Sequence, residues 1–358
     1  MSPRPVAVVG AAAVSAAGLC WRGLASRTIE PARSRELEAS HPGTLAFEVP
    51  PIPPAADAGD ARARKAMSRP ARLAAIAARE ALADAGFRGG AEATGYFLGV
   101  GASGGPVSEM LAMLLGSLDA QGEVSPARLG AEGLAASNPL FTFHVLNNFT
   151  LCHGAILSGI QGPNAALFSR GGGTVTALRE AAFAVGEGDC DRALAGGADT
   201  ALHPVTWSEL CRDGFAAGGL VPGEGAALLA LERIGGGGSP LAYLERASVL
   251  AGRRHSLEEV LEAAVASEPD RPVDHLILAP WGEAARAALH RFARRALPGA
   301  PILDVTRRLG ESLAATPALA WVSALDLLTA GSSARALVLS AGIDGDLGLV
   351  TLAREPHR

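Results

Sequence analysis

Short apolar runs alternate along the chain with longer segments in which alanine and leucine recur at helical spacing. An apolar run over residues 6–9, followed by Gly10, predicts a buried first strand that ends in a glycine turn. After a surface excursion, residues 68–86 predict an alanine-rich helix, because Ser68 is a capping residue and Gly86 ends the pattern. The chain therefore starts with a strand and then a helix.

The same alternation continues to the end of the chain. It predicts strands over residues 95–101, 192–198, 223–232, 243–249, 275–278, 302–305, 336–339 and 347–352. It predicts helices over residues 110–118, 174–185, 256–266, 283–296 and 318–328. Strands that alternate with helices indicate an α/β architecture with helices packed on the sheet faces. The glycine-rich run 235–238 is the best internal boundary, so we expect two halves of one integrated unit, residues 1–235 and 236–358.

Composition narrows the class of protein. The 358 residues are 49% apolar and 19% charged, which is enough apolar chain for one large core or two modest ones and excludes a disordered protein. A net charge of −5 argues against a nucleic-acid binder held by phosphate contacts. Thirty arginines accompany a single lysine, Lys65, so a mechanism that needs a lysine has one candidate.

The cysteines and the N-terminus bear on the compartment. Cys20, Cys152, Cys190 and Cys211 lie far apart with no C-x-x-C pair, which predicts neither a disulfide framework nor a zinc site and favours a reducing cytoplasm. The first apolar run imitates a secretion signal, but it is rich in glycine and alanine and passes directly into Trp21. We interpret it as a strand, and no later stretch is apolar for long enough to span a bilayer.

Three glycine-rich strings are more specific than the periodicity. Residues 162–178 contain Gly-Pro-Asn and, after Ser169, Gly-Gly-Gly-Thr; residues 195–199 read Ala-Gly-Gly-Ala-Asp; and residues 223–226 read Gly-Glu-Gly-Ala. Their order and content resemble the β-ketoacyl synthase family, the condensing enzymes of fatty-acid and polyketide assembly. The resemblance spans nearly the whole chain. It implies the thiolase-like α/β fold, in which two similar halves stack in five layers (αβαβα) and form dimers.

The sequence departs from this family at the positions that carry its chemistry. A condensing enzyme needs a thiolate at a helix N-terminus and two imidazoles that polarise the thioester and stabilise the developing negative charge. Counting from the Gly-Pro-Asn string places Gly171 at the nucleophile position. In the second half, Trp281 and Glu311 stand at the two histidine positions, and Thr306 stands near the lysine position. The closing glycine-rich loop, residues 341–347, is also altered.

A shift in register does not restore the histidines, since histidine is absent between His255 and His275 and between His290 and His357. The family includes members without the nucleophile, the chain-length factors or ketosynthase β subunits, which pair with an active ketosynthase. The resemblance therefore predicts a catalytically silent subunit, with no catalytic residue, metal or cofactor. It would form a heterodimer with an active ketosynthase in polyketide, polyene or fatty-acid-type chain elongation. Well-known chain-length factors carry glutamine where Gly171 stands, so a glutamine-linked decarboxylation does not carry over.

Two other functions remain open on the sequence. Ser169 is either a capping hydroxyl or a substitute nucleophile, and a nucleophile needs a base in contact. With Glu311 as that base, the chain would be an acyl transferase or hydrolase. A non-catalytic homodimeric scaffold is the third option. Cys152 next to His153 suggests a catalytic pair, but side chains of neighbouring residues usually point apart, so a structural role is favoured.

A basic run lies at the start of the first long helix. It consists of Arg62, Arg64, Lys65, Arg69 and Arg72. Opposite charge speeds encounter, so the run would suit an acidic acyl carrier protein, whereas most such runs are solvated helix faces. The carrier protein is thus the second expected partner after the active ketosynthase. Neither nucleic acid nor a membrane span is expected.

Overall fold

Ten strands form one continuous sheet made of two five-stranded halves. The computed structural model describes residues 6–87, 93–102, 104–251, 257–266 and 272–356. Within them, the first half has the strand order β1 (Val6–Val14), β7 (Glu224–Arg233), β6 (Arg192–Thr200), β4 (Thr94–Val100) and β5 (Asn164–Phe168). The second half has the order β8 (Ala242–Ala251), β12 (Asp346–Ala353), β11 (Arg335–Ala341), β9 (His275–Pro280) and β10 (Ile302–Asp304).

The two halves share one topology. In each, the first two strand pairings are antiparallel and the last two are parallel. The halves meet where β1 and β8 pair antiparallel over three residues each, with Val6 opposite Leu244 and Val8 opposite Ala242. β5 and β10 are the outer edges of the combined sheet.

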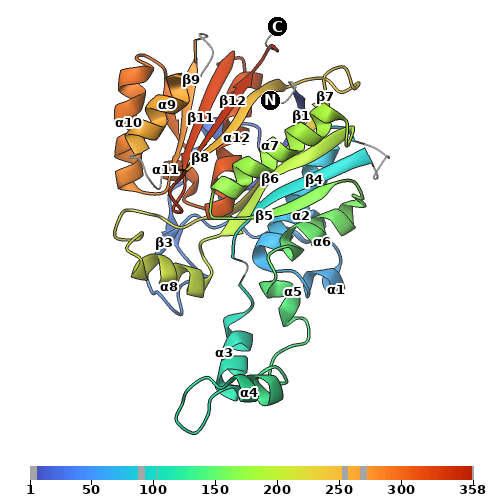
Figure 1. The fold of residues 1–358 in the computed structure, drawn as a ribbon, viewed down its shortest axis with the longest axis vertical. Helices are drawn as coiled ribbons and strands as arrows, with labels where there is room; N and C mark the ends of the chain where they lie inside the picture. The colour runs from blue at the N-terminus through green and yellow to red at the C-terminus, as the bar shows by residue number, and fades with distance from the viewer. Residues whose placement is uncertain (1–5, 88–92, 103, 252–256, 267–271, 357–358) are drawn as a thin grey trace.

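Helices form the other three layers. α7 (Gly172–Glu187) and α12 (Thr316–Thr329) lie between the sheet halves and contact strands of both. On the outer faces, α2 (Arg69–Asp84) and α6 (Phe149–Ser158) cover the first half, and α9 (Leu257–Ala266) and α10 (Glu283–Ala296) cover the second (Figure 1). These five layers of two similar halves confirm the predicted thiolase-like α/β fold class.

Apolar packing explains the layering. The largest apolar cluster surrounds α7 and α12, a second lies between the first sheet half and α2, and a third lies between the second sheet half and α10. All nine residues of β1 are buried, because helices cover both faces of that strand. A strand covered on both faces reads as a continuous apolar run instead of an alternating one.

A helical arm leaves the first half between β4 and β5. We call residues 106–140 the arm; it contains α3 (Val107–Gly116), α4 (Pro126–Arg128) and η4 (Leu129–Gly133) and projects from the layered body (Figure 1). The chain returns to the body through α5 (Phe141–Val145). The smaller elements are η1 (Leu24–Ser26), β2 (Ala32–Arg33), β3 (Leu45–Ala46), η2 (Pro54–Ala56), α1 (Ala61–Arg64), α8 (Pro204–Arg212), α11 (Thr306–Leu309) and η5 (Leu313–Ala315).

The predicted strands and helices match these elements closely, with one correction at the first strand. β1 does not end in a turn at Gly10 but continues to Val14, with a register irregularity between Val8 and Gly10. Gly10 is needed for close packing, because a Cβ there would lie 2.6 Å from the backbone nitrogen of Ala85. Residue 256 of the predicted helix over 256–266 lies outside the described residues. Among those described, no helix combines the length and apolarity needed to cross a membrane.

Candidate functional site

The predicted nucleophile position lies at the junction of β5 and α7. Gly171 is the residue before the first turn of α7 and has a φ of +156°, a conformation that residues with side chains rarely adopt. It borders a cavity of about 10 Å³ together with Glu311, Thr316 and Gly342. A cavity of this size holds one water molecule at most. The site therefore offers neither a nucleophilic side chain nor space for an acyl group.

Carboxylates of the closing loop lie against the start of α7. Asp344 accepts hydrogen bonds from the backbone N–H of Arg170 at 3.0 Å and from its guanidinium at 2.7 and 3.0 Å. A Cβ on Gly172 would lie 2.4 Å from Oδ2 of Asp346. Because the positive end of a helix dipole stabilises negative charge, the chain's own carboxylates occupy the place that would favour an anionic nucleophile or oxyanion.

Ser169 acts as a cap for α7. Its hydroxyl oxygen accepts the backbone N–H of Gly173 at 2.5 Å and that of Gly171 at 3.3 Å. Within the described part of the chain, its hydroxyl makes no hydrogen bond to a histidine or a carboxylate. A serine nucleophile needs such a base, so the local geometry favours the capping role.

Glu311 is brought to the Gly171 cavity as its register predicts, but it is tied into the fold. Its Oε1 accepts the hydroxyl of Thr316 at 2.7 Å and the backbone N–H of Leu313 at 2.8 Å. Burial raises the pKa of Glu311 to about 8, against the lowering effect of these hydrogen bonds, and the nearby Asp199 carboxylate raises it further. The carboxyl group therefore holds a proton at neutral pH.

Asp199, at the end of β6, forms a second buried carboxyl group. It accepts the backbone N–H groups of Thr200 at 2.8 Å and Ala314 at 3.3 Å. Burial raises the pKa of Asp199 to about 7. Gly101 approaches so closely that a Cβ on it would collide with the carboxylate. Asp199 thus links the first half of the protein to the segment that follows Glu311.

Trp281 lines a separate cavity of about 150 Å³ that it shares with Glu311 and Arg286. Its indole packs edge-on against Phe215, with 5.1 Å between the ring centroids. Its backbone N–H donates to the carbonyl of Ala341 at 3.1 Å. Trp281 therefore forms part of the wall of this cavity and does not fill it. Glu311 borders both this cavity and the smaller one at Gly171.

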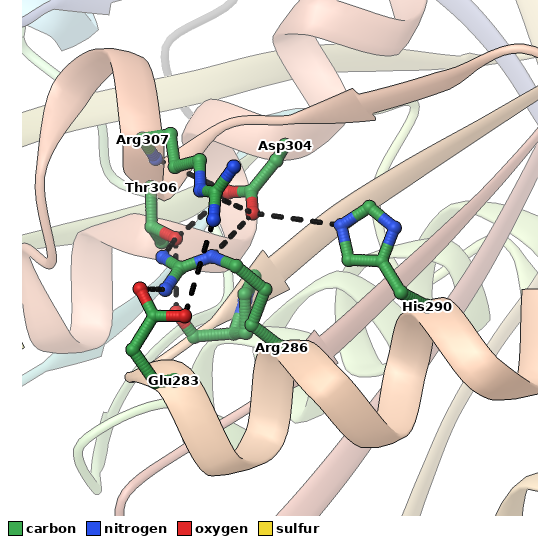
Figure 2. Close-up of polar contacts among 7 residues, drawn as sticks. Glu283, Arg286, His290, Asp304, Thr306 and Arg307 are labelled. Atoms are coloured by element: carbon green, nitrogen blue, oxygen red, sulfur yellow. Dashed lines mark hydrogen bonds and ion pairs between the residues drawn. The ribbon is translucent and has the colours of Figure 1, made fainter. Parts of the chain in front are cut away.

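Arg286 places a buried cation beside Thr306, near the expected lysine position. Its guanidinium donates to Asp304 at 2.7 Å, to Glu283 at 2.5 Å and to Oγ1 of Thr306 at 3.2 Å (Figure 2). The Thr306 hydroxyl donates to the carbonyl of Pro280 at 2.9 Å. The cation comes from α10 and is neutralised by the two carboxylates, so it is a structural charge.

Two histidines of the first half, His144 and His153, contact backbone carbonyls. Nε2 of His144 contacts the carbonyl of Lys65 at 2.9 Å, and Nε2 of His153 contacts the carbonyl of Ala66 at 3.0 Å. Burial lowers the pKa of His153. These contacts support the structural interpretation of His153 over a catalytic pair with Cys152. Among the described residues, no group of three His, Cys, Asp or Glu side chains is placed to hold a metal ion.

Most of the basic run is paired within the chain. Arg69 donates to both carboxylate oxygens of Glu224, at 2.8 and 2.6 Å. Arg72 makes a bidentate pair with Asp57, and Arg64 lies 3.5 Å from the same carboxylate. The exposed members of the run are Arg62 and Lys65.

Comparison with known families decides what kind of protein carries this arrangement. The family model described as "Beta-ketoacyl synthase, N-terminal domain" matches residues 4–234. The chain belongs to the β-ketoacyl synthase family. The match confirms the resemblance drawn from the glycine-rich strings. No curated protein sequence matches the chain.

Solved structures show the same fold over the whole chain. The ishigamide ketosynthase/chain length factor is 21% identical, with a TM-score of 0.77, covering 98% of this chain and 99% of that one. A β-ketoacyl synthase from Burkholderia phymatum STM815 is 17% identical, with a TM-score of 0.74, covering 99% and 100%. The third structure is described as a type II PKS acyl-carrier protein in complex with its ketosynthase bound to the hexaketide. Its matching chain is 14% identical, with a TM-score of 0.72, covering 99% of this chain and 100% of that one.

Several residues at this β-ketoacyl synthase site were not predicted from the sequence. Asp199 ends one of the strings that carried the resemblance, yet nothing local indicated its burial beside Glu311. The altered closing loop signalled a change, but the contact between Arg170 and Asp344 joins residues 174 positions apart. Arg286 belongs to no recognisable motif in the sequence. It reaches Thr306 only because of the way in which α10 packs.

Proposed function

We propose that this member of the β-ketoacyl synthase family is a catalytically silent subunit of the chain-length-factor type. It would pair with an active ketosynthase in polyketide, polyene or fatty-acid-type chain elongation. The observation that carries the proposal is Gly171. The residue at the start of α7 has no side chain and faces a cavity of about 10 Å³, so no acyl group can be held there covalently.

Two further features support catalytic silence. The carboxylate of Asp346 lies against Gly172 at the start of α7, and its negative charge opposes a thiolate or an oxyanion at that point, while Asp344 is paired with Arg170 just before the helix. The histidine positions hold Trp281 and Glu311, so neither supplies the imidazole that condensation uses.

The open edge of the sheet supports pairing. β5 pairs with β4 on one side, and no described strand pairs with its other side. Phe168, at the end of β5, is 62% exposed. An unpaired edge that carries an exposed aromatic ring is suited to a second chain.

The pairing is tested by co-expressing the chain with the active ketosynthases of the same genome and measuring the mass of the complex by light scattering after gel filtration. We expect a one-to-one heterodimer. A chain that elutes alone as a monomer or homodimer while the ketosynthase elutes separately would overturn the proposal.

Silence is tested on the same preparation by intact-protein mass spectrometry after incubation with an acyl N-acetylcysteamine thioester. We expect the acyl group on the ketosynthase and none on this chain. An adduct on this chain that disappears in a Ser169→Ala variant would instead establish the hydrolase or acyl transferase alternative. The matched control is Ser158→Ala, a serine at the end of α6 that does not border the cavity at Gly171.

Carrier docking forms a secondary part of the proposal. The exposed Arg62 and Lys65 on and beside α1 supply positive charge for an acidic carrier protein, whereas Arg69 and Arg72 are already committed to Glu224 and Asp57. With two free charges, the contribution of this chain to docking would be small, and the active partner would carry most of it.

A further inference from the structure

The cavity beside Trp281 is a different space from the one at Gly171. Its volume is about 150 Å³, room for about five water molecules of roughly 30 Å³ each. Its walls come from the N-terminal segment that carries Phe47, from the loop before β7 that carries Val221, and from the starts of α10 and α11. Glu311 is the one described residue that borders both cavities. The larger cavity therefore lies apart from the predicted nucleophile position.

One oxygen of the Glu311 carboxyl group is left without a partner. Oε1 accepts the hydroxyl of Thr316 and the backbone N–H of Leu313, whereas Oε2 makes no hydrogen bond to any described residue. Glu311 is only 4% exposed, and leaving a buried polar atom unpaired is costly. Burial raises the pKa of Glu311 to about 8, so the group carries a proton at neutral pH. Because Oε1 already accepts two hydrogen bonds, that proton lies on Oε2 and makes it a donor.

Two arginines border the same cavity, and an exposed carboxylate lies against both of them. The guanidinium of Arg286 donates to Asp304 at 2.7 Å and to Glu283 at 2.5 Å (Figure 2). Glu283 also lies 3.9 Å from the guanidinium of Arg307. The side chain of Asp304 is 9% exposed and that of Glu283 is 63% exposed. Asp304 is thus a fixed counter-ion of Arg286, whereas Glu283 is free to turn into solvent.

The cavity offers more hydrogen-bond donors than acceptors. Arg307 lies 3.9 Å from Glu283 and 4.0 Å from Asp304, too far for a hydrogen bond to either carboxylate. In the described chain, no side chain caps the start of α10, which begins at Glu283 on the cavity wall, so the positive end of the helix dipole is uncompensated there. Trp281 and Phe47 supply an apolar wall. These features suit a small ligand with an anionic, acceptor-only head and a short alkyl group.

We propose that this cavity binds a short-chain monocarboxylate of about two to four carbon atoms. One carboxylate oxygen takes the place of Glu283 on Arg286, the other accepts the proton of Glu311 Oε2, and the alkyl group packs against Trp281. In the free protein, the carboxylate of Glu283 occupies the position of the ligand and competes with it. The site is built from this chain alone, so it does not depend on the pairing with a ketosynthase.

Binding should depend on the protonation of Glu311. The charged groups that surround it come from several elements and are Arg170 before α7, Asp199 of β6, Glu283 and Arg286 of α10, Asp304 of β10 and Arg307 of α11. The arginines keep their charge at all relevant pH values. The pKa of Asp199 is about 7, so Asp199 is largely ionised by pH 8. Above pH 8, an ionised Glu311 loses its donor and repels the ligand, and the dissociation constant should rise at least tenfold by about pH 9.5.

The first test is a titration of the purified chain with propionate at pH 7, followed by saturation-transfer difference NMR, with propionamide as the uncharged analogue. We expect saturable, millimolar binding of propionate and at least tenfold weaker binding of propionamide. Glu283→Ala removes the competing carboxylate, so it should bind propionate at least about threefold more tightly than wild type. The matched control is Glu132→Ala on the arm, because Glu132 is 59% exposed and is likewise paired with an arginine, Arg128. It should bind as wild type does.

The second test compares Glu311→Gln with wild type at pH 8 and pH 9.5. The glutamine amide keeps a donor at the same place and does not ionise, so its affinity should be equal at the two pH values while that of wild type falls at least about tenfold. The proposal is overturned if neither wild type nor Glu283→Ala binds propionate saturably, or if propionamide binds equally well. A Glu311→Gln variant with the pH profile of wild type would also overturn it. All of these outcomes leave the pairing proposal untouched, since gel filtration with the ketosynthase tests that separately.

Discussion

The helices α12 and α3 are both apolar and rich in leucine, yet they have opposite surroundings. α12 lies between the two sheet halves, and twelve of its fourteen residues are buried. α3 lies on the arm and has no buried residue among its ten, all of which are described. Apolar composition therefore does not distinguish a helix that is covered by its own chain from a helix that its own chain leaves exposed. The positions of the covering elements in three dimensions make that distinction.

Truncation of the enclosed helix should have the largest effect. Leu325 of α12 is fully buried in the central cluster. Leu325→Ala would remove apolar contact and leave a cavity between the sheet halves, at a cost of about 2–5 kcal/mol in the free energy of unfolding. Urea denaturation followed by circular dichroism measures this change. A loss below about 1 kcal/mol would mean that the middle layer is not closely packed.

Close packing at the start of α7 should give the next largest effect. A methyl group on Gly172 would collide with the carboxylate of Asp346, so Gly172→Ala should lower the free energy of unfolding by about 1–3 kcal/mol. The matched control is Gly130→Ala in the arm, where a Cβ meets no atom within 4 Å. Equal thermal midpoints for the two variants would contradict the contact between the closing loop and α7.

The buried carboxyl groups of the body should make stability depend on pH. Because the pKa of Glu311 is raised from 4.5 to about 8, the folded protein keeps a proton that the unfolded chain has lost. This contribution is complete below pH 4.5 and is lost as the pH rises toward 8, at up to about 1.4 kcal/mol per pH unit.

Glu311→Gln removes that titration, so its unfolding free energy should change less steeply between pH 6.5 and 8 than that of wild type. This range avoids His153, whose lowered pKa acts in the opposite sense below pH 6.5. Asp199 titrates in both proteins and its carboxylate interacts with Glu311, so the difference in slope reports the loss of the Glu311 titration together with its effect on Asp199. Chemical denaturation at four pH values gives the slope, and parallel profiles would refute the assignment.

The smallest effect on stability is expected for the same truncation on the arm. Leu114 of α3 is 44% exposed, so Leu114→Ala should change the free energy of unfolding of the isolated chain by less than about 0.5 kcal/mol. Set beside Leu325→Ala, it compares one chemical change in two surroundings. A loss as large as that of Leu325→Ala would show that the arm is covered within the chain.

Much of the fold could be predicted because its signals are local. The cap at Ser68 and the alternation of apolar strands with helices each depend on residues that are close in the sequence. The observed elements agree with them. β5 was not predicted because it is a short, partly exposed edge strand whose apolar run is only four residues, Ala165 to Phe168. Gly10 was misjudged because its reason is a contact with Ala85, 75 positions away.

Gly171 was assigned by counting from the Gly-Pro-Asn string, and Glu311 was assigned by its place after a glycine; that they stand at catalytic positions of the family stays a prediction. Gly171 and Glu311 meet at one cavity, as their alignment to the family suggested. The carboxylates around them were not predictable, since the contacts of Asp344 with Arg170 and of Asp199 with Ala314 join distant segments. Such pairings depend on how the two halves stack. The pattern of a single sequence does not predict how the two halves stack.

Lys65 gives this molecule an experimental handle. It is the single lysine of the chain, and it is exposed. Its backbone carbonyl lies 2.9 Å from Nε2 of His144, where the chain returns from the arm. Guanidinium groups stay protonated at neutral pH and do not react with succinimidyl esters. A dye ester would therefore attach at the terminal amine and at one internal site, beside the point where the arm joins the body, without any engineered cysteine. Fluorescence anisotropy of that dye would report the binding of a partner close to the point where the arm leaves the body.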